Sequence, residues 1–144
     1  MEDKHRFEFL ITGYADPPYL LEDHFNNIGG RALMHVVRKS LVARGYTCDE
    51  VDQEDYGWSV LAEKPNESYH IALGVWSDVN DDLTSTSEGW LDVSVWDTRG
   101  LIQRWFKKRE MPSIRDTDGA TELRSVLKET GGIQTMKEIY MNND

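Results

Sequence analysis

Three segments in the middle of the chain alternate between apolar and polar residues, and this period of two constrains the fold more than any other feature. They span residues 57–64, 67–77 and 88–98. The apolar positions of the second and third segments are Tyr69, Ile71, Leu73, Val75, Leu91, Val93 and Val95. Because only Pro65 and Asn66 separate the first two segments, we expect a hairpin there. The sequence therefore predicts three strands of an antiparallel meander.

The flanking segments add further predicted strands and helices. Outside the meander, residues 5–14 alternate well enough for a strand, and residues 46–55 are expected to form a short polar edge strand. The predicted helices, each with an apolar stripe, span residues 29–44, 99–114, 118–130 and 133–141. Gly131 and Gly132 separate the last two predicted helices.

The segment 29–44 gives the clearest helical signal. Leu33, Val37 and Leu41 recur at fourfold spacing, and Asn27 is the predicted N-cap. The glycines at its start also suit an anion site, although a plain helix start is the simpler interpretation. From all these elements we predict one α+β domain over residues 1–144. It has an antiparallel sheet of four to five strands packed against one main helix, with additional C-terminal helices.

The negative charge of the chain is concentrated in one region. The formal net charge is −10, and residues 46–98 contain thirteen acidic residues, a single basic residue (Lys64) and four of the five tryptophans. An acidic surface repels phosphate groups, so direct binding to nucleic acid or to an anionic membrane is not expected. Tryptophan is a preferred anchor in protein interfaces. The region therefore predicts a surface that contacts a partner protein.

Cysteine content and hydropathy indicate the compartment. Cys48 is the one cysteine, so no disulfide can form within the chain. The first five residues are charged rather than apolar, unlike a signal peptide, and no window approaches the roughly 20 apolar residues of a membrane span. We expect a soluble cytoplasmic protein.

The second face of the meander follows from the same alternation. Its predicted residues are Ser59, Leu61, Glu63, His70, Ala72, Gly74, Trp76, Trp90, Asp92, Ser94 and Trp96. Small residues would form a floor between tryptophan side chains. Two arrangements stay open. A C-terminal helix covers this face and buries the tryptophans, which is the more common outcome, or the face is an open platform for a partner.

An acidic run precedes the first strand of the meander. It consists of Asp49, Glu50, Asp52, Glu54 and Asp55. Three interpretations stay open: a solvated edge that prevents edge-to-edge pairing, a surface that complements a basic partner, and a source of carboxylates for a divalent metal. Gly57 lets the backbone bend after the run. This bend aims Tyr56 towards a partner or closes the end of the core with Tyr56 and Trp58.

Few residues suit catalysis. His70 lies beside Glu63 or Asp92 in some strand registers, which is the one arrangement that fits general acid–base chemistry. Residues 77–82 resemble a calcium loop in part, but they lack the central glycine of an EF-hand, so an ordinary turn is favoured. Nearby carboxylates are expected to raise the pKa of Cys48 and to disfavour a thiolate nucleophile. We predict no catalytic residue, no cofactor and no metal.

The leading hypothesis is a non-enzymatic, acidic protein-binding module that acts as an inhibitor. An immunity-type protein against a toxin, or a phage-type inhibitor of a defence nuclease, would dock in this way on a basic nucleic-acid-binding surface. The residues predicted to steer the partner are Asp49, Glu50, Asp52, Glu54 and Asp55, and the predicted anchors are Tyr56, Trp76, Trp90 and Trp96.

Two alternatives stay open. One is a small hydrolase with a His70–carboxylate pair or a carboxylate-bound divalent metal, and the other is a small-ligand sensor. No motif carries a resemblance to a named family, and the sequence leaves the partner and the oligomeric state open.

Overall fold

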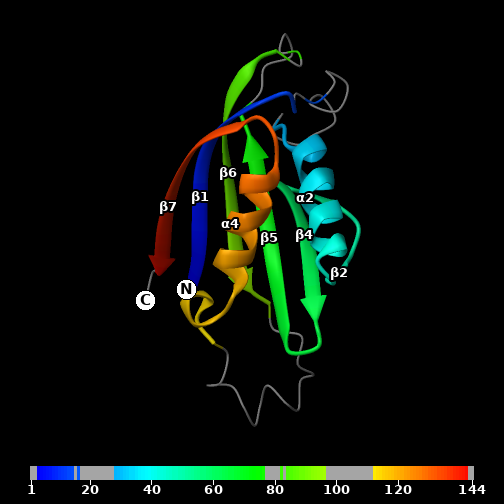
Figure 1. Cartoon of the computed structure of the whole chain (residues 1–144), viewed down its shortest axis with the longest axis vertical. Helices are drawn as coiled ribbons and strands as arrows, with labels where there is room; N and C mark the ends of the chain where they lie inside the picture. The colour runs from blue at the N-terminus through cyan, green and yellow to red at the C-terminus, as the bar shows by residue number, and fades with distance from the viewer. Residues whose placement is uncertain are drawn as a thin grey trace.

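The computed structural model describes residues 3–14, 16, 28–76, 82, 84–96 and 112–142. Within these residues, seven antiparallel strands form one curled sheet that carries two α-helices on a single face (Figure 1). The strands are β1 (Asp3–Thr12), β2 (Thr47–Cys48), β3 (Asp52–Glu54), β4 (Gly57–Lys64), β5 (Glu67–Val75), β6 (Thr86–Val95) and β7 (Ile133–Asn142). The helices are α2 (Arg31–Ala43) and α4 (Gly119–Glu129), and a short 3-10 helix, η1 (Ile114–Asp116), precedes α4. Across the sheet the order is β2-β4-β5-β6-β1-β7, and β3 also pairs with β4.

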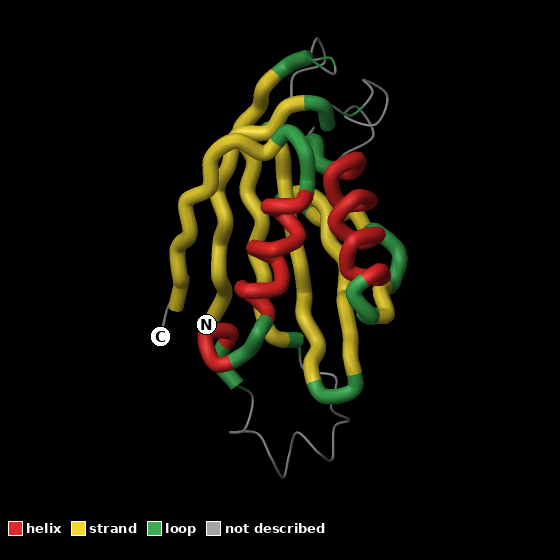
Figure 2. Tube along the Cα trace, in the orientation of Figure 1, coloured by secondary structure: helices red, strands yellow, loops and turns green. Residues whose placement is uncertain are grey.

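The predicted fold class is wrong in two respects. The described sheet has seven strands rather than four or five, because residues 46–55 form two short strands on β4 and the C-terminal segment adds another. There is also no single main helix, since α2 and α4 share one sheet face (Figure 2). The hairpin and meander of β4, β5 and β6 are confirmed, because these strands are consecutive antiparallel neighbours.

The hydrophobic core lies between the two helices and one sheet face, called the inner face here. The buried side chains of the helices are Leu33, Met34, Val37, Leu41, Leu123, Val126 and Leu127. They form one cluster with alternate residues of the strands, among them Phe7, Phe9, Ile11, Val60, Ile71, Leu73, Leu91 and Val93. Both helices are needed because one helix is about 10 Å wide and each strand adds about 4.8 Å to the sheet.

The N-terminus of α2 is bound by a side chain from far upstream. The carboxylate of Asp16 accepts hydrogen bonds from three backbone amides, those of Gly30 (2.7 Å), Arg31 (3.1 Å) and Ala32 (2.8 Å). Asp16 is 3% exposed. A buried carboxylate at this position satisfies free amides and suits the helix dipole. The predicted cap, Asn27, lies outside the described residues, and the anion at the helix start is the protein's own.

Replacement of Asp16 tests this contact. Asp16→Ala leaves three backbone amides, one buried and two partly buried, without their side-chain acceptor, so the free energy of unfolding should fall by about 2 kcal/mol. Asp16→Asn keeps one side-chain oxygen and should lose about half as much. Urea unfolding followed by circular dichroism measures both. A change below about 0.5 kcal/mol for the alanine variant would mean that α2 does not depend on this cap.

The segment predicted as a helix over 133–141 is instead the edge strand β7. It pairs with β1 from Asp3↔Asn142 to Ile11↔Ile133. The sequence is ambiguous because its apolar residues suit a helical stripe as well as a pleated strand. Pairing with β1 decides the matter, since β7 supplies backbone hydrogen-bond partners to the edge of β1 that β6 leaves open. Tertiary pairing therefore overrides the local pattern.

The turn before β7 depends on Gly132. Its φ angle is 89°, and a Cβ at this position would collide with the carbonyl oxygen of Thr12. The Thr12 amide donates to the Gly132 carbonyl at 3.0 Å, which joins the turn to the end of β1. A Cβ on the preceding residue, Gly131, would meet no atom within 4 Å. The two neighbouring glycines thus differ sharply in how well they tolerate a side chain.

This difference gives a matched pair of variants. We expect Gly132→Ala to lower the free energy of unfolding by about 2 kcal/mol, because it adds both backbone strain and a clash. Gly131→Ala should change it by less than about 0.5 kcal/mol. Thermal and urea unfolding measure both effects. Equal losses in the two variants would contradict the observed turn geometry.

Some predicted elements cannot be compared with the structure. The predicted helix over 99–114 lies mostly outside the described residues, as does most of the calcium-like segment 77–82. Asp82, which is described, caps a local turn by accepting from the Thr84 amide at 2.8 Å. In the described part of the chain, no helix combines the length and apolar character needed to cross a membrane.

Candidate functional site

The sheet face that points away from α2 and α4 is called the outer face here. Its central residues share one face as the alternation predicts, and the structure adds the register: His70 lies opposite Leu61 and Ser94, and Ala72 opposite Asp92. No helix of the described residues packs on it, and Figure 1 shows both helices on the other side of the sheet. The hypothesis that a C-terminal helix covers this face is therefore wrong for the described residues, since α4 packs on the inner face and 133–142 is a strand.

Aromatic side chains remain accessible at the two ends of the outer face. Trp76 is 60% exposed, Trp96 44% and Tyr56 43%. Trp58, in contrast, is buried: it points to the inner face, is 6% exposed, and donates from Nε1 to the Ile28 carbonyl at 3.1 Å. Tyr56 and Trp58 therefore do not close the core together. Exposed rings of this size are anchors that proteins use in interfaces.

Gly74 allows the side chains of Trp90 and Tyr56 to pack closely on the outer face. Gly74 lies opposite Trp90, and a Cβ on Gly74 would come within 2.9 Å of the Trp90 Nε1 atom. The indole of Trp90 therefore lies across the glycine instead of standing upright. The Tyr56 ring, from the β3–β4 turn, reaches it with a centroid distance of 6.1 Å and an interplanar angle of 49°. Close backbone approach at Gly74 is what makes this ring contact possible.

A charged cluster borders the Trp90 ring. Arg6 binds Asp92 through two hydrogen bonds, Nε–Oδ1 at 2.7 Å and Nη2–Oδ2 at 2.9 Å, and its guanidinium lies 5.0 Å from the centroid of Trp90. Lys4 Nζ lies 3.0 Å from the same carboxylate. Asp92 is 8% exposed, so its charge is held by two cations in a largely dry site. The bidentate geometry fixes the orientation of Arg6.

These side chains line a groove of about 590 Å³ on the outer face. Tyr56 and Trp76 stand at one side, Trp90 forms part of the floor, and residues of β1 and β7 stand at the other side. The volume falls in the usual range of binding sites. The small-ligand sensor therefore stays a prediction alongside a protein-binding role.

The acidic run lies along the β2–β3 edge of the sheet, next to Tyr56. Two of its carboxylates also hold the edge together: Asp49 Oδ1 accepts from the Leu61 amide at 2.7 Å, and Glu54 Oε1 accepts from Ser59 Oγ at 3.0 Å. Burial, and after it the carboxylates of Glu54, Asp92 and Asp55, raise the pKa of the Tyr56 phenol. Carboxylates of the acidic run and Asp92 of the outer face therefore both act on Tyr56.

Sequence reasoning did not find the residues of β1 and β7 that line one side of the groove. Arg6, Glu8 and Lys137 line it, from β1 and β7. Glu8 lies opposite both Trp90 and Lys137 in the two strand pairings. The alternation of 5–14 gave a signal that Arg6 and Glu8 share one face, but not that β1 lies next to β6. The mistaken helix over 133–141 removed Lys137 from consideration altogether.

His70 does not form the predicted acid–base pair. Its register neighbours are Leu61 and Ser94 rather than Glu63 or Asp92, and its ring packs against Trp96 at 5.8 Å. No carboxylate of the described residues makes a hydrogen bond with the ring. Burial lowers the pKa of His70, although three carboxylates, with Glu54 the strongest, oppose this shift. The ring is therefore a packed, mainly neutral side chain near physiological pH.

Cys48 and the acidic run are the remaining candidates for chemistry. Cys48 is a free, half-buried thiol whose pKa is raised mainly by burial, with Arg38 lowering it and Asp49 raising it. Among the described residues, no group of three histidine, cysteine or carboxylate side chains could hold a metal ion. The five carboxylates of the run follow the sheet edge in a line, whereas a metal needs converging ligands.

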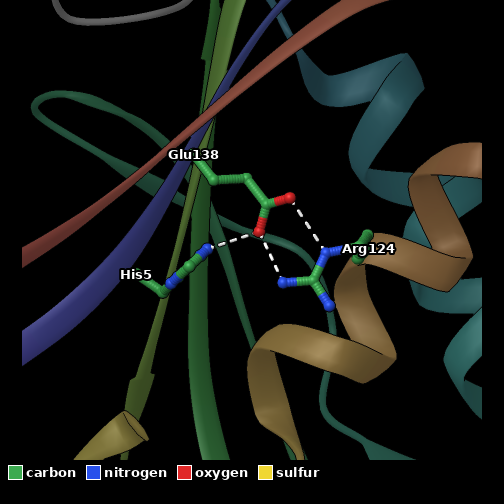
Figure 3. A network of polar contacts seen from close by, with 3 residues as sticks. All are labelled: His5, Arg124 and Glu138. Carbon is green, nitrogen blue, oxygen red and sulfur yellow. Dashed lines mark hydrogen bonds and ion pairs between the residues drawn. The ribbon is translucent and has the colours of Figure 1, made fainter.

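A second polar network lies on the inner side of the sheet and fastens the edge strand (Figure 3). Glu138 of β7 accepts from Arg124 of α4 through Nε at 2.9 Å and Nη2 at 2.6 Å, and His5 Nε2 of β1 lies 2.7 Å from its Oε1. The Arg124 hydrogen bonds, assisted by His5, lower the pKa of Glu138 to about 2. A carboxylate that stays ionised at neutral pH is a clamp rather than a proton carrier.

The Glu138 clamp predicts a pH dependence. Because its folded pKa lies below the ordinary value of 4.5, it stabilises the fold above pH 4.5, and this stabilisation is lost as the pH falls towards 2. Partial exposure limits the effect to about 1 kcal/mol. Urea unfolding between pH 6 and 2 should therefore show a shallower loss of stability in Glu138→Gln than in the parent protein. Glu50→Gln, at an exposed position, should follow the parent curve, and parallel curves for all three would contradict the clamp.

Comparisons with known proteins identify no relative: no family model matches the chain, and neither a curated protein nor a solved structure matches it at a significant level.

Proposed function

We propose that the protein is a non-enzymatic binding module whose outer face docks on a basic, nucleic-acid-binding surface of another protein and blocks it. The observation that carries this proposal is the position of the exposed rings of Tyr56, Trp76 and Trp96 on a face that no described helix covers. The acidic run borders the same face at Tyr56. Long-range attraction would speed association, and the aromatic anchors would slow release.

The class of partner follows from charge. Thirteen acidic residues against one lysine over residues 46–98 complement the basic surfaces with which proteins bind phosphates. A nuclease, whether a toxin or a defence enzyme, is a partner of this kind, and occupation of its substrate site would inhibit it. A cytoplasmic location is part of the proposal, and the free thiol of Cys48 supports it.

Charge variants test the proposal. The triple variant Asp52→Asn, Glu54→Gln, Asp55→Asn removes three charges beside Tyr56 but keeps side-chain oxygens for the local hydrogen bonds. The probes are a panel of purified nucleases of net positive charge, with binding measured by biolayer interferometry from 50 mM to 500 mM salt. We expect the association rate to fall about tenfold at low salt, and this difference to vanish at high salt.

The matched control removes the same charge from the helix side of the molecule. Asp116→Asn, Asp118→Asn and Glu129→Gln change three exposed carboxylates, and their effect should be less than about twofold because they lie far from the outer face. Binding that is independent of salt, or equal losses in both triple variants, would contradict docking through the acidic edge. Nuclease activity measured with the bound module reports inhibition directly.

A further inference from the structure

The groove contains a second arrangement of the type that already holds Arg6. On β6, residues 88, 90 and 92 alternate as acid, tryptophan and acid on one strand face, because side chains two apart point to the same side. Asp92 and Trp90 together bind the Arg6 guanidinium, the first by two hydrogen bonds and the second through its ring at 5.0 Å. Among the described residues, no cation is paired in this way with Glu88, on the other side of Trp90.

Trp76 supplies the ring for this second arrangement. Its backbone amide donates to the Glu88 carbonyl at 2.9 Å, so Trp76, directly after β5, lies beside Glu88 of β6. Trp76 is the most exposed large apolar side chain of the described residues, at 60%. The Glu88 carboxylate is exposed and makes no hydrogen bond or ion pair within the described part of the chain. Both groups line the groove.

The lysine of the groove lies too far along the sheet to neutralise Glu88. Lys137 pairs with Glu8 on β1, and Glu88 pairs with Leu10 on the opposite side of β1. Two strand spacings, roughly 10 Å, therefore separate the β6 and β7 backbones at this point. The direct register neighbour of Lys137 is Glu8 rather than Glu88. The Glu88 carboxylate therefore lies beside an accessible indole, without a register neighbour that is basic.

We propose that the groove takes an arginine side chain of the basic partner, with its guanidinium stacked on Trp76 and paired with Glu88. This inference rests on the proposed function and specifies its central contact. Arginine suits the site better than lysine, because a planar guanidinium is weakly hydrated, stacks on indole and binds a carboxylate through two donors. The Arg6 contact with Trp90 and Asp92 shows the same chemistry within the molecule.

Nuclear magnetic resonance tests the site with Nα-acetyl-arginine amide as the probe. Its citrulline analogue has nearly the same shape without the charge, and the lysine analogue has the charge without the planar group. We expect arginine to shift the indole N–H resonances of Trp76 and Trp90 saturably, with a dissociation constant on the order of 10 mM for so small a ligand. The buried Trp58 should not respond. Lysine should bind more weakly and citrulline not at all.

Two variants separate charge from stacking. Glu88→Gln should weaken the arginine probe about fivefold, whereas Glu63→Gln, an exposed acid of β4 outside the groove, should change its affinity by less than about twofold. Trp76→Ala should abolish the shift at Trp90. Equal shifts with citrulline, an unchanged Glu88→Gln variant, or no shift at either indole would each overturn the proposal.

The two proposals fail in different ways. If the arginine probe does not bind but nuclease binding still depends on Asp52, Glu54 and Asp55, the arginine site is wrong and the docking surface stands. If arginine binds beside Trp76 but the charge variants leave nuclease binding unchanged, the proposed function is wrong and the groove recognises arginine in another context.

Discussion

The apolar side chains of α2 and α4 pack against one face of a seven-stranded sheet, and the properties of the other face follow from this choice. One side of the sheet is closed by two amphipathic helices, which contribute fully buried residues such as Leu33, Leu41 and Leu127. No described helix remains to cover the outer face. Aromatic and charged side chains therefore gather there, over a floor made by Ala72 and Gly74, and the outer face is where binding chemistry is found.

The central position of β1 connects the two halves of the molecule. It pairs with β6 on one side and with β7 on the other, so β1 borders the meander and β7 lies one strand further out. On the outer face this places Arg6 against Asp92 and Trp90. On the inner face it places His5 against Glu138, whose clamp to Arg124 attaches the edge strand to α4. The groove and the clamp thus use opposite faces of the same strand.

Local pattern was sufficient where neighbours in the sequence are also neighbours in space. The hairpin at Pro65, the meander and the inward residues of β5 and β6 were predicted because alternation and a short turn leave few other arrangements, whereas the register came only from the structure. The pattern failed over 133–142, where spacing suits both a helix and a strand and the free edge of β1 decides. It also missed Asp16, which lies fourteen residues from the Gly30 amide that it binds. Contacts of that kind leave no periodic signal.

The sequence alone determined the acidic run, the exclusion of an internal disulfide and the identity of the residues on each face of the meander, since these depend on composition and on the period of a strand. Tertiary structure decided which face the helices cover, because the apolar stripe of a helix does not specify the sheet face against which it packs. It also decided that Arg6 and Lys137 line the groove. β1 pairs with β6, and β7 pairs with β1, between residues that are far apart in the sequence.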